Sequence, residues 1–83
     1  MPQYHIFHAT SDKRFTETVN QPREYAAFVL ANNLDEAFKL SQNDWNPNWS
    51  RPHRPLRSTS VGDVIQADDG FYMVCGMGFK KLG

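Results

Sequence analysis

The sequence has one cysteine and no excess of either charge, and both shortages exclude classes of protein. Cys75 cannot form an intramolecular disulfide or build a cysteine-based zinc site. Nine basic and nine acidic residues give a formal net charge of zero. The field of the whole protein therefore gives no reason to expect a nucleic acid or an anionic membrane as partner, and any basic site must be local.

Long hydrophobic runs are missing as well. No stretch approaches the ~18 apolar residues of a membrane span. Residues 1–15 lack the charged segment followed by an apolar segment that marks a signal peptide. We therefore expect a cytoplasmic protein without a membrane partner.

The composition that is present suits a small folded domain. The chain has 83 residues, so we predict a single domain over residues 1–83. Apolar residues make up 40% and aromatic residues 13%, which argues against disorder because each aromatic side chain buries a large area. A chain of this length buries only about 60–65% of its unfolded surface, so its margin of stability is thin.

The first residues read as extended chain. Residues 4–9 favour a strand with Tyr4 and Ile6 on one face and His5 and Phe7 on the other. Residues 14–19 alternate between apolar and polar types, which fits either a short exposed strand or an extended loop.

Residues 23–31 are nearly all apolar, and they allow two interpretations. Such a run is typical of a central strand buried on both faces. Alternatively, Pro22 could start a helix that continues to Gln42. The pair Asn32-Asn33 interrupts the run, which favours the strand.

A helix is predicted after this run. Asn33 has the properties of an N-cap, and Glu36 lies three residues later, as in a capping box. Leu34, Ala37 and Phe38 fall on one helical face. The helix should end near Gln42.

The C-terminal residues predict a hairpin. Residues 63–67 form one strand, Asp68-Asp69-Gly70 makes a tight reversal, and residues 71–77 form an interior return strand. Lys80-Lys81 read as a solvated tail. The fold class is therefore α+β: a small antiparallel sheet of four to five strands with one helix packed on it, in the order β-β-(β)-α-β-β.

The segment before the hairpin is the best candidate for a binding surface. Residues 43–57 contain three prolines and no hydrophobic period, which indicates a loop. Aromatic rings and guanidinium groups together are typical of single-stranded nucleic-acid sites and of protein hot spots. The alternative is that the tryptophans fold down as a lid over the core. The candidate residues are Trp45, Trp49, Arg51, Arg54, Arg57 and Ser58.

Other chemistry-bearing residues have simpler interpretations. Cys75 should be a small core residue. His5, His8 and His53 lack metal-ligand spacing and should lie at edges or on the surface. Asp63, Asp68 and Asp69 are explained by a strand start and a turn. The hydroxyl-rich residues 57–60 lack the phosphate-loop pattern. We therefore predict no catalytic residue, no metal and no cofactor.

Three stretches together resemble a known family. LDEAFKLSQNDW (34–45), RSTSVGDVI (57–65) and GFYMVCGMGFKKL (70–82) are similar, in the same order, to segments of short YodL-like proteins of bacteria, phages and plasmids. The resemblance covers about half of the chain and brings no catalytic residue. It implies an accessory or counter-defence module carried by mobile elements.

These observations leave three functional hypotheses. The first is a non-enzymatic binding module that contacts a protein partner through the Trp/Arg segment or a sheet edge. The second is a single-stranded nucleic-acid binder, with Trp45 and Trp49 stacking on bases. The third is an enzyme or a protein that sequesters a small ligand, which needs a concave polar pocket. A homo-oligomer fits the apolar strands.

Overall fold

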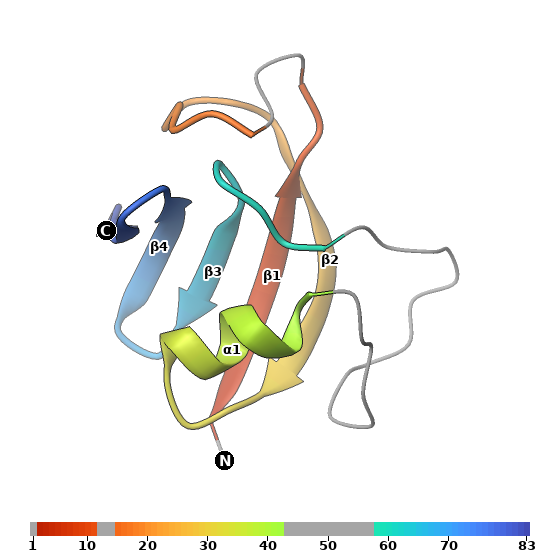
Figure 1. Ribbon diagram of the computed structural model, residues 1–83, viewed down its shortest axis with the longest axis vertical. Helices are drawn as coiled ribbons and strands as arrows, with labels where there is room; N and C mark the ends of the chain where they lie inside the picture. The colour runs from red at the N-terminus through yellow and green to blue at the C-terminus, as the bar shows by residue number, and fades with distance from the viewer. Residues whose placement is uncertain (1, 12–14, 43–57) are drawn as a thin grey trace.

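The computed structural model describes residues 2–11, 15–42 and 58–83, which form one five-stranded antiparallel sheet and one helix. Figure 1 shows the helix lying across one face of the sheet. The α+β class is therefore confirmed. In chain order the elements are β1 (Gln3–Ala9), β2 (Arg23–Leu30), α1 (Leu34–Leu40), β3 (Val64–Ala67), β4 (Gly70–Cys75) and β5 (Gly78–Lys81).

The strands lie side by side in the order β2-β1-β3-β4-β5. β1 therefore occupies an interior position between its neighbour in the chain, β2, and the distant β3. Ile6 is opposite Ala27 on one side and opposite Ile65 on the other. These positions face α1 and are buried. The core therefore contains residues from the strands before the helix and from the strands after it.

The predicted order of elements is wrong in detail. Residues 15–19 form no strand, so the extended loop was the better alternative there. The return strand predicted over residues 71–77 ends at Cys75, and β5 then pairs back so that Phe79 is opposite Val74. Gly78 has φ +123°, a conformation that permits this second reversal. Lys80-Lys81 thus belong to β5 and are no tail.

β2 confirms the strand interpretation of residues 23–31 and corrects its position. It lies at the edge of the sheet, where Tyr25 is 45% exposed, and is no central strand buried on both faces. The register shifts between Ile6 and Phe7, which leaves Ala26 as an extra residue on β2. Such a bulge twists an edge strand and hinders its pairing with other chains.

The helix begins as its sequence predicts. The Asn33 side chain accepts a hydrogen bond from the Glu36 N–H at 2.8 Å. The Glu36 carboxylate reaches back one residue further than in a capping box, to the N–H of Asn32. Leu34 and Phe38 pack against the core, and the Phe38 ring meets Phe79 edge to face. The helix is short, so this packing stabilises it more than its own propensity does.

Within the described ranges, no helix is long and apolar enough to span a membrane. The cytoplasmic location stays a prediction.

Candidate functional site

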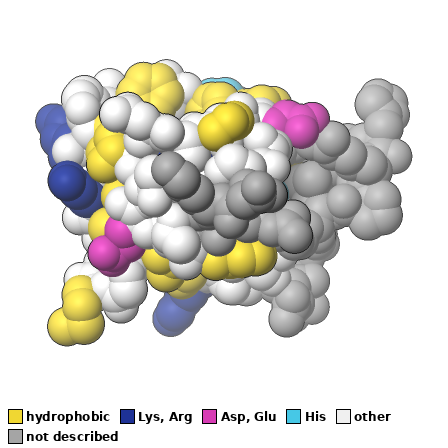
Figure 2. Space-filling view, turned by 90° about the horizontal axis from the view of Figure 1, so that it is seen from above, with side chains coloured by type: hydrophobic (Ala, Val, Ile, Leu, Met, Phe, Trp, Pro, Cys, Tyr) yellow, Lys and Arg dark blue, Asp and Glu magenta, His cyan; other side chains and the backbone are white. Residues whose placement is uncertain are grey.

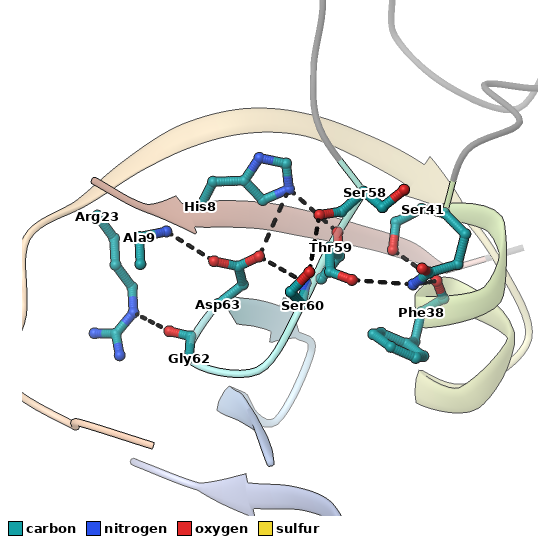
Figure 3. A network of polar contacts seen from close by, with 11 residues as sticks. His8, Ala9, Arg23, Phe38, Ser41, Ser58, Thr59, Ser60, Gly62 and Asp63 are labelled. Atoms are coloured by element: carbon teal, nitrogen blue, oxygen red, sulfur yellow. Dashed lines mark hydrogen bonds and ion pairs between the residues drawn. The ribbon is translucent and has the colours of Figure 1, made fainter. Parts of the chain in front are cut away.

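Most of the residues predicted to bind a partner lie outside the described residues: Trp45, Trp49, Arg51, Arg54 and Arg57, together with His53. Their role in binding stays a prediction. Ser58 is described. Its carbonyl accepts a hydrogen bond from the Ser60 hydroxyl at 3.3 Å, next to the C-terminal end of α1 (Figure 3). A ligand contact by Ser58 is likewise a prediction.

Residues on either side of segment 43–57 are joined by hydrogen bonds. The Thr59 N–H donates to the Ser41 carbonyl at 2.9 Å. The Gln42 side-chain amide donates to the carbonyls of Thr59 and Phe38 at 3.1 and 3.0 Å. These contacts fix where the chain leaves the helix and where it returns to the sheet.

Asp63 is the centre of a buried polar network, drawn in Figure 3. Its side chain is fully buried. One carboxylate oxygen accepts from the N–H of Ala9 and the other from the N–H of Ser60, both at 2.8 Å. The carbonyl of Asp63 accepts from the N–H of Val74. The side chain thus ties the end of β1 to the start of β3, which is a structural role.

His8, Thr59 and Asp63 form a histidine–hydroxyl–carboxylate group, but their geometry does not suit nucleophilic catalysis. A catalytic histidine uses one ring nitrogen for the nucleophile and the other for the carboxylate. In this structure a single ring nitrogen, Nε2 of His8, faces both groups. It lies 3.2 Å from the Thr59 hydroxyl and 4.0 Å from the Asp63 carboxylate. Thr59 is also buried, so no substrate reaches its hydroxyl. The prediction that His8 lies at the surface was wrong, because this network buries it.

Gly62 and Arg23 complete the scaffold around Asp63. Gly62 has φ +95°, and a Cβ built there would lie 2.4 Å from the Thr16 carbonyl oxygen. The Arg23 guanidinium donates to four main-chain carbonyls, including that of Gly62 at 2.9 Å, and approaches the Met73 sulfur. The Gly-Asp pair that carries part of the YodL-like resemblance therefore stabilises the fold.

The face of the sheet turned away from α1 carries a continuous string of aromatic rings. We call it the aromatic face, and its rings are His5, Phe7, Tyr25, Phe28 and Phe71. The centroids of neighbouring rings are separated by 5.4–6.3 Å. In order along the string, the rings are Phe28, His5, Tyr25, Phe7 and Phe71. Figure 2 shows hydrophobic side chains together with a histidine and an acidic side chain at the upper rim of the molecule.

The rings at the two sides of this string are accessible. Tyr25 on β2 is 45% exposed and Phe71 on β4 is 41% exposed. His5 is on β1, the strand between β2 and β3, and its Nδ1 lies 3.1 Å from the Tyr25 hydroxyl. Partial burial raises the pKa of Tyr25 above its usual value, so the hydroxyl stays neutral at physiological pH. The face therefore presents neutral π surfaces with a few polar groups.

The charged residues that the strands themselves place on the aromatic face are positive. The strand register places Arg23 and Lys80 on this side, and no Asp or Glu within the five strands shares it. Glu24, which pairs with His8, falls on the opposite side. The strands of this neutral chain thus place two cations on the aromatic face, while the carboxylates of Glu17 and Asp68 lie at its borders, beside Cys75 and in a depression shared with His5.

Arg23 also borders an apolar depression of about 260 Å³ in the aromatic face. The depression is lined by Phe7, Arg23, Val64, Phe71, Leu82 and Gly83. Its volume is below the ~300–1,000 Å³ of pockets for whole drug-sized ligands, so it suits one flat ring of a larger partner.

Two other kinds of chemistry-bearing group among the described residues are a possible metal cluster and the thiol of Cys75. In the described part of the chain, no three His, Cys, Asp or Glu side chains are grouped to hold a metal ion. Cys75 is only partly buried, at the end of β4, instead of lying in the core. Burial and the nearby Glu17 carboxylate raise the pKa of its thiol, which disfavours the nucleophilic thiolate.

Comparison of the chain with models of protein families, with curated proteins and with solved structures finds no match. The YodL-like resemblance stays a prediction, as do the mobile-element context and the counter-defence role that it implies.

Proposed function

We propose that this chain is a non-enzymatic module that binds single-stranded nucleic acid across its aromatic face. The observation that carries the proposal is the string of five rings on one side of the sheet, with Tyr25 and Phe71 exposed. Successive bases of a single strand stack on such rings, because every base has a π face. The proposal keeps the nucleic-acid hypothesis of the sequence but moves it to a different surface.

Charge favours nucleic acid over a protein as the occupant. A single strand presents unpaired bases and a chain of phosphates, which match exposed rings beside cations. Lys80 is exposed on this side of β5 and is suited to a phosphate. The Arg23 side chain is held by carbonyl oxygens, so it contributes a fixed positive charge near Phe7 and Phe71.

The apolar depression supports the same occupant. Two aromatic rings, Phe7 and Phe71, line it together with the aliphatic Val64 and Leu82, Gly83 and the cationic Arg23. A base that stacks on Phe71 covers this depression and excludes water from it. The protein-partner hypothesis depends instead on the Trp/Arg segment or a sheet edge, and the bulge at Ala26 hinders pairing along the β2 edge.

The test is a titration of labelled single-stranded DNA and RNA at low salt, followed by fluorescence anisotropy. The wild-type protein should bind both. Tyr25→Ala/Phe71→Ala should lower the affinity about tenfold or more, since stacking contributes ~1–3 kcal/mol per base. Met77→Ala is the matched control, because Met77 is fully exposed at the β4–β5 turn. If folded wild-type protein binds neither strand, the proposal is overturned in favour of a protein partner.

A further inference from the structure

A second, polar depression adjoins the aromatic face. It has a volume of about 270 Å³ and is lined by Gln3, His5, Gln66, Ala67 and Asp68. His5 belongs both to this lining and to the string of rings. The other lining side chains offer two amides and a carboxylate, whereas the depression beside Phe71 and Val64 is almost entirely apolar.

Gln66 is placed where it can reach a stacked base. In the strand register it lies opposite His5 on β1 and opposite Phe71 on β4. Neighbouring strands are ~4.8 Å apart, so the amide stands one strand away from either ring. A base stacked on His5 or Phe71 would thus lie within one strand spacing of the Gln66 position.

Asp68 supplies an acceptor at the same place. It is exposed in the turn between β3 and β4 and lines the depression with His5 and Gln66. The neighbouring Asp69 serves the other side of the sheet. Its carboxylate accepts from the Tyr72 hydroxyl at 2.7 Å and lies 3.9 Å from the Lys81 ammonium. Asp69 thus has a hydroxyl and an ammonium as partners on the α1 side, whereas Asp68 lines the polar depression.

We propose that the polar depression is a base-reading subsite that selects adenine and cytosine through their exocyclic amino groups, N6 and N4. The inference rests on the proposed function. A glutamine amide forms paired hydrogen bonds with N6 and N7 of adenine, and a carboxylate accepts from N4 of cytosine. Thymine and uracil present a carbonyl oxygen where cytosine has its amino group, which a carboxylate repels. The subsite therefore favours adenine and cytosine over thymine and uracil.

The experiment compares labelled oligo-dA, oligo-dC and oligo-dT of equal length, titrated with the full chain at low salt. The wild type should bind oligo-dA and oligo-dC about fivefold or more tightly than oligo-dT, the lower end of the discrimination of a paired base contact. Self-stacking of oligo-dA is the same for every variant, so a change in the affinity ratio between variants reports on the protein alone.

Three variants locate the effect. Gln66→Ala should reduce the preference for oligo-dA over oligo-dT to less than twofold, and Asp68→Asn should do the same for oligo-dC. Asp69→Asn, the matched control, should leave both ratios unchanged. Thermal unfolding checks that each variant is folded.

The possible failures point to different conclusions. Equal wild-type affinity for the three oligonucleotides, or an equal effect of Asp68→Asn and Asp69→Asn, overturns the subsite and leaves the proposed function standing. If the wild type binds none of the three, the proposed function itself is overturned.

Discussion

The carboxylate of Asp63 accepts a hydrogen bond from the backbone N–H of Ala9 at 2.8 Å, although 54 positions separate the two residues. This contact joins the end of β1 to the beginning of β3, and the second carboxylate oxygen holds the N–H of Ser60. The Asp63 carboxylate thus reinforces the pairing of β1 with β3, the two neighbouring strands that carry His5, Phe7 and Gln66 on the aromatic face.

Asp63→Ala should therefore destabilise the protein strongly. It removes the acceptor of the buried Ala9 N–H and of the partly buried Ser60 N–H. A buried N–H that loses its acceptor costs about 1–3 kcal/mol, and a partly buried one costs less. We expect the free energy of unfolding, measured by urea denaturation, to fall by about 2–4 kcal/mol. Asp69→Ala, which removes an exposed carboxylate, should cost less than about 1 kcal/mol. Equal losses for the two variants would contradict the structural role of Asp63.

Two glycines with positive φ provide a second matched comparison. Gly62→Ala and Gly78→Ala both place a Cβ in an unfavourable backbone conformation. Only at Gly62 does the new Cβ also collide with the Thr16 carbonyl, since the space around Gly78 is open. Urea denaturation should show Gly62→Ala to be the more destabilising variant by about 1–3 kcal/mol, the typical cost of overpacking. The opposite ranking would rule out this account of the Gly-Asp turn.

Stability should decrease at alkaline pH. Burial, helped by the carboxylates of Asp68 and Asp69, raises the pKa of Tyr4 above its usual value of 10.0. The folded state therefore holds this proton more tightly than the unfolded state. The contribution of the protonated Tyr4 hydroxyl to the free energy of unfolding is fully present below about pH 10. It is lost as the pH rises through the pKa of Tyr4 in the folded state.

A substitution isolates this contribution. Tyr4→Phe removes the titrating hydroxyl, so its free energy of unfolding should decrease less steeply above pH 10 than that of the wild type. Urea denaturation between pH 8 and pH 12 measures the two slopes, with the values below pH 9 as the internal reference. Parallel curves above pH 10 would show that Tyr4 does not titrate differently in the two states.

Local signals in the sequence predicted the local features of the fold. The Asn33 cap is specified by residues within one helical turn, and the Asp68-Asp69-Gly70 reversal is specified by its own side chains, so both were confirmed. The strand at residues 23–30 was likewise predictable from its composition. The position of this strand at the edge of the sheet could not be predicted. A central strand and an edge strand that carries exposed rings can have the same run of apolar residues.

The candidate site needed long-range information. Alternation alone placed His5 and Phe7 on one face of the first strand, but it did not tell which face α1 would cover. The Asp63 network links three separate segments, and no short motif marks it. The second reversal at Gly76 and Met77 was missed because the apolar alternation of β4 continues past Cys75 in the sequence although the strand does not.

Lys80 and Lys81 test the central claim most directly, because they are neighbours on β5 that point to opposite sides of the sheet. In the register, Lys80 pairs with Met73 on the aromatic face, while Lys81 pairs with Tyr72 on the side of α1. The measurement is the affinity for single-stranded DNA as a function of salt for wild type, Lys80→Ala and Lys81→Ala. Each phosphate contact contributes about 0.7 to the slope of log K against log salt for a single strand.

The account predicts that Lys80→Ala weakens binding at low salt and reduces the magnitude of the slope by about 0.7, whereas Lys81→Ala changes neither quantity. Equal effects of the two substitutions, or a larger effect at Lys81, would contradict binding across the aromatic face.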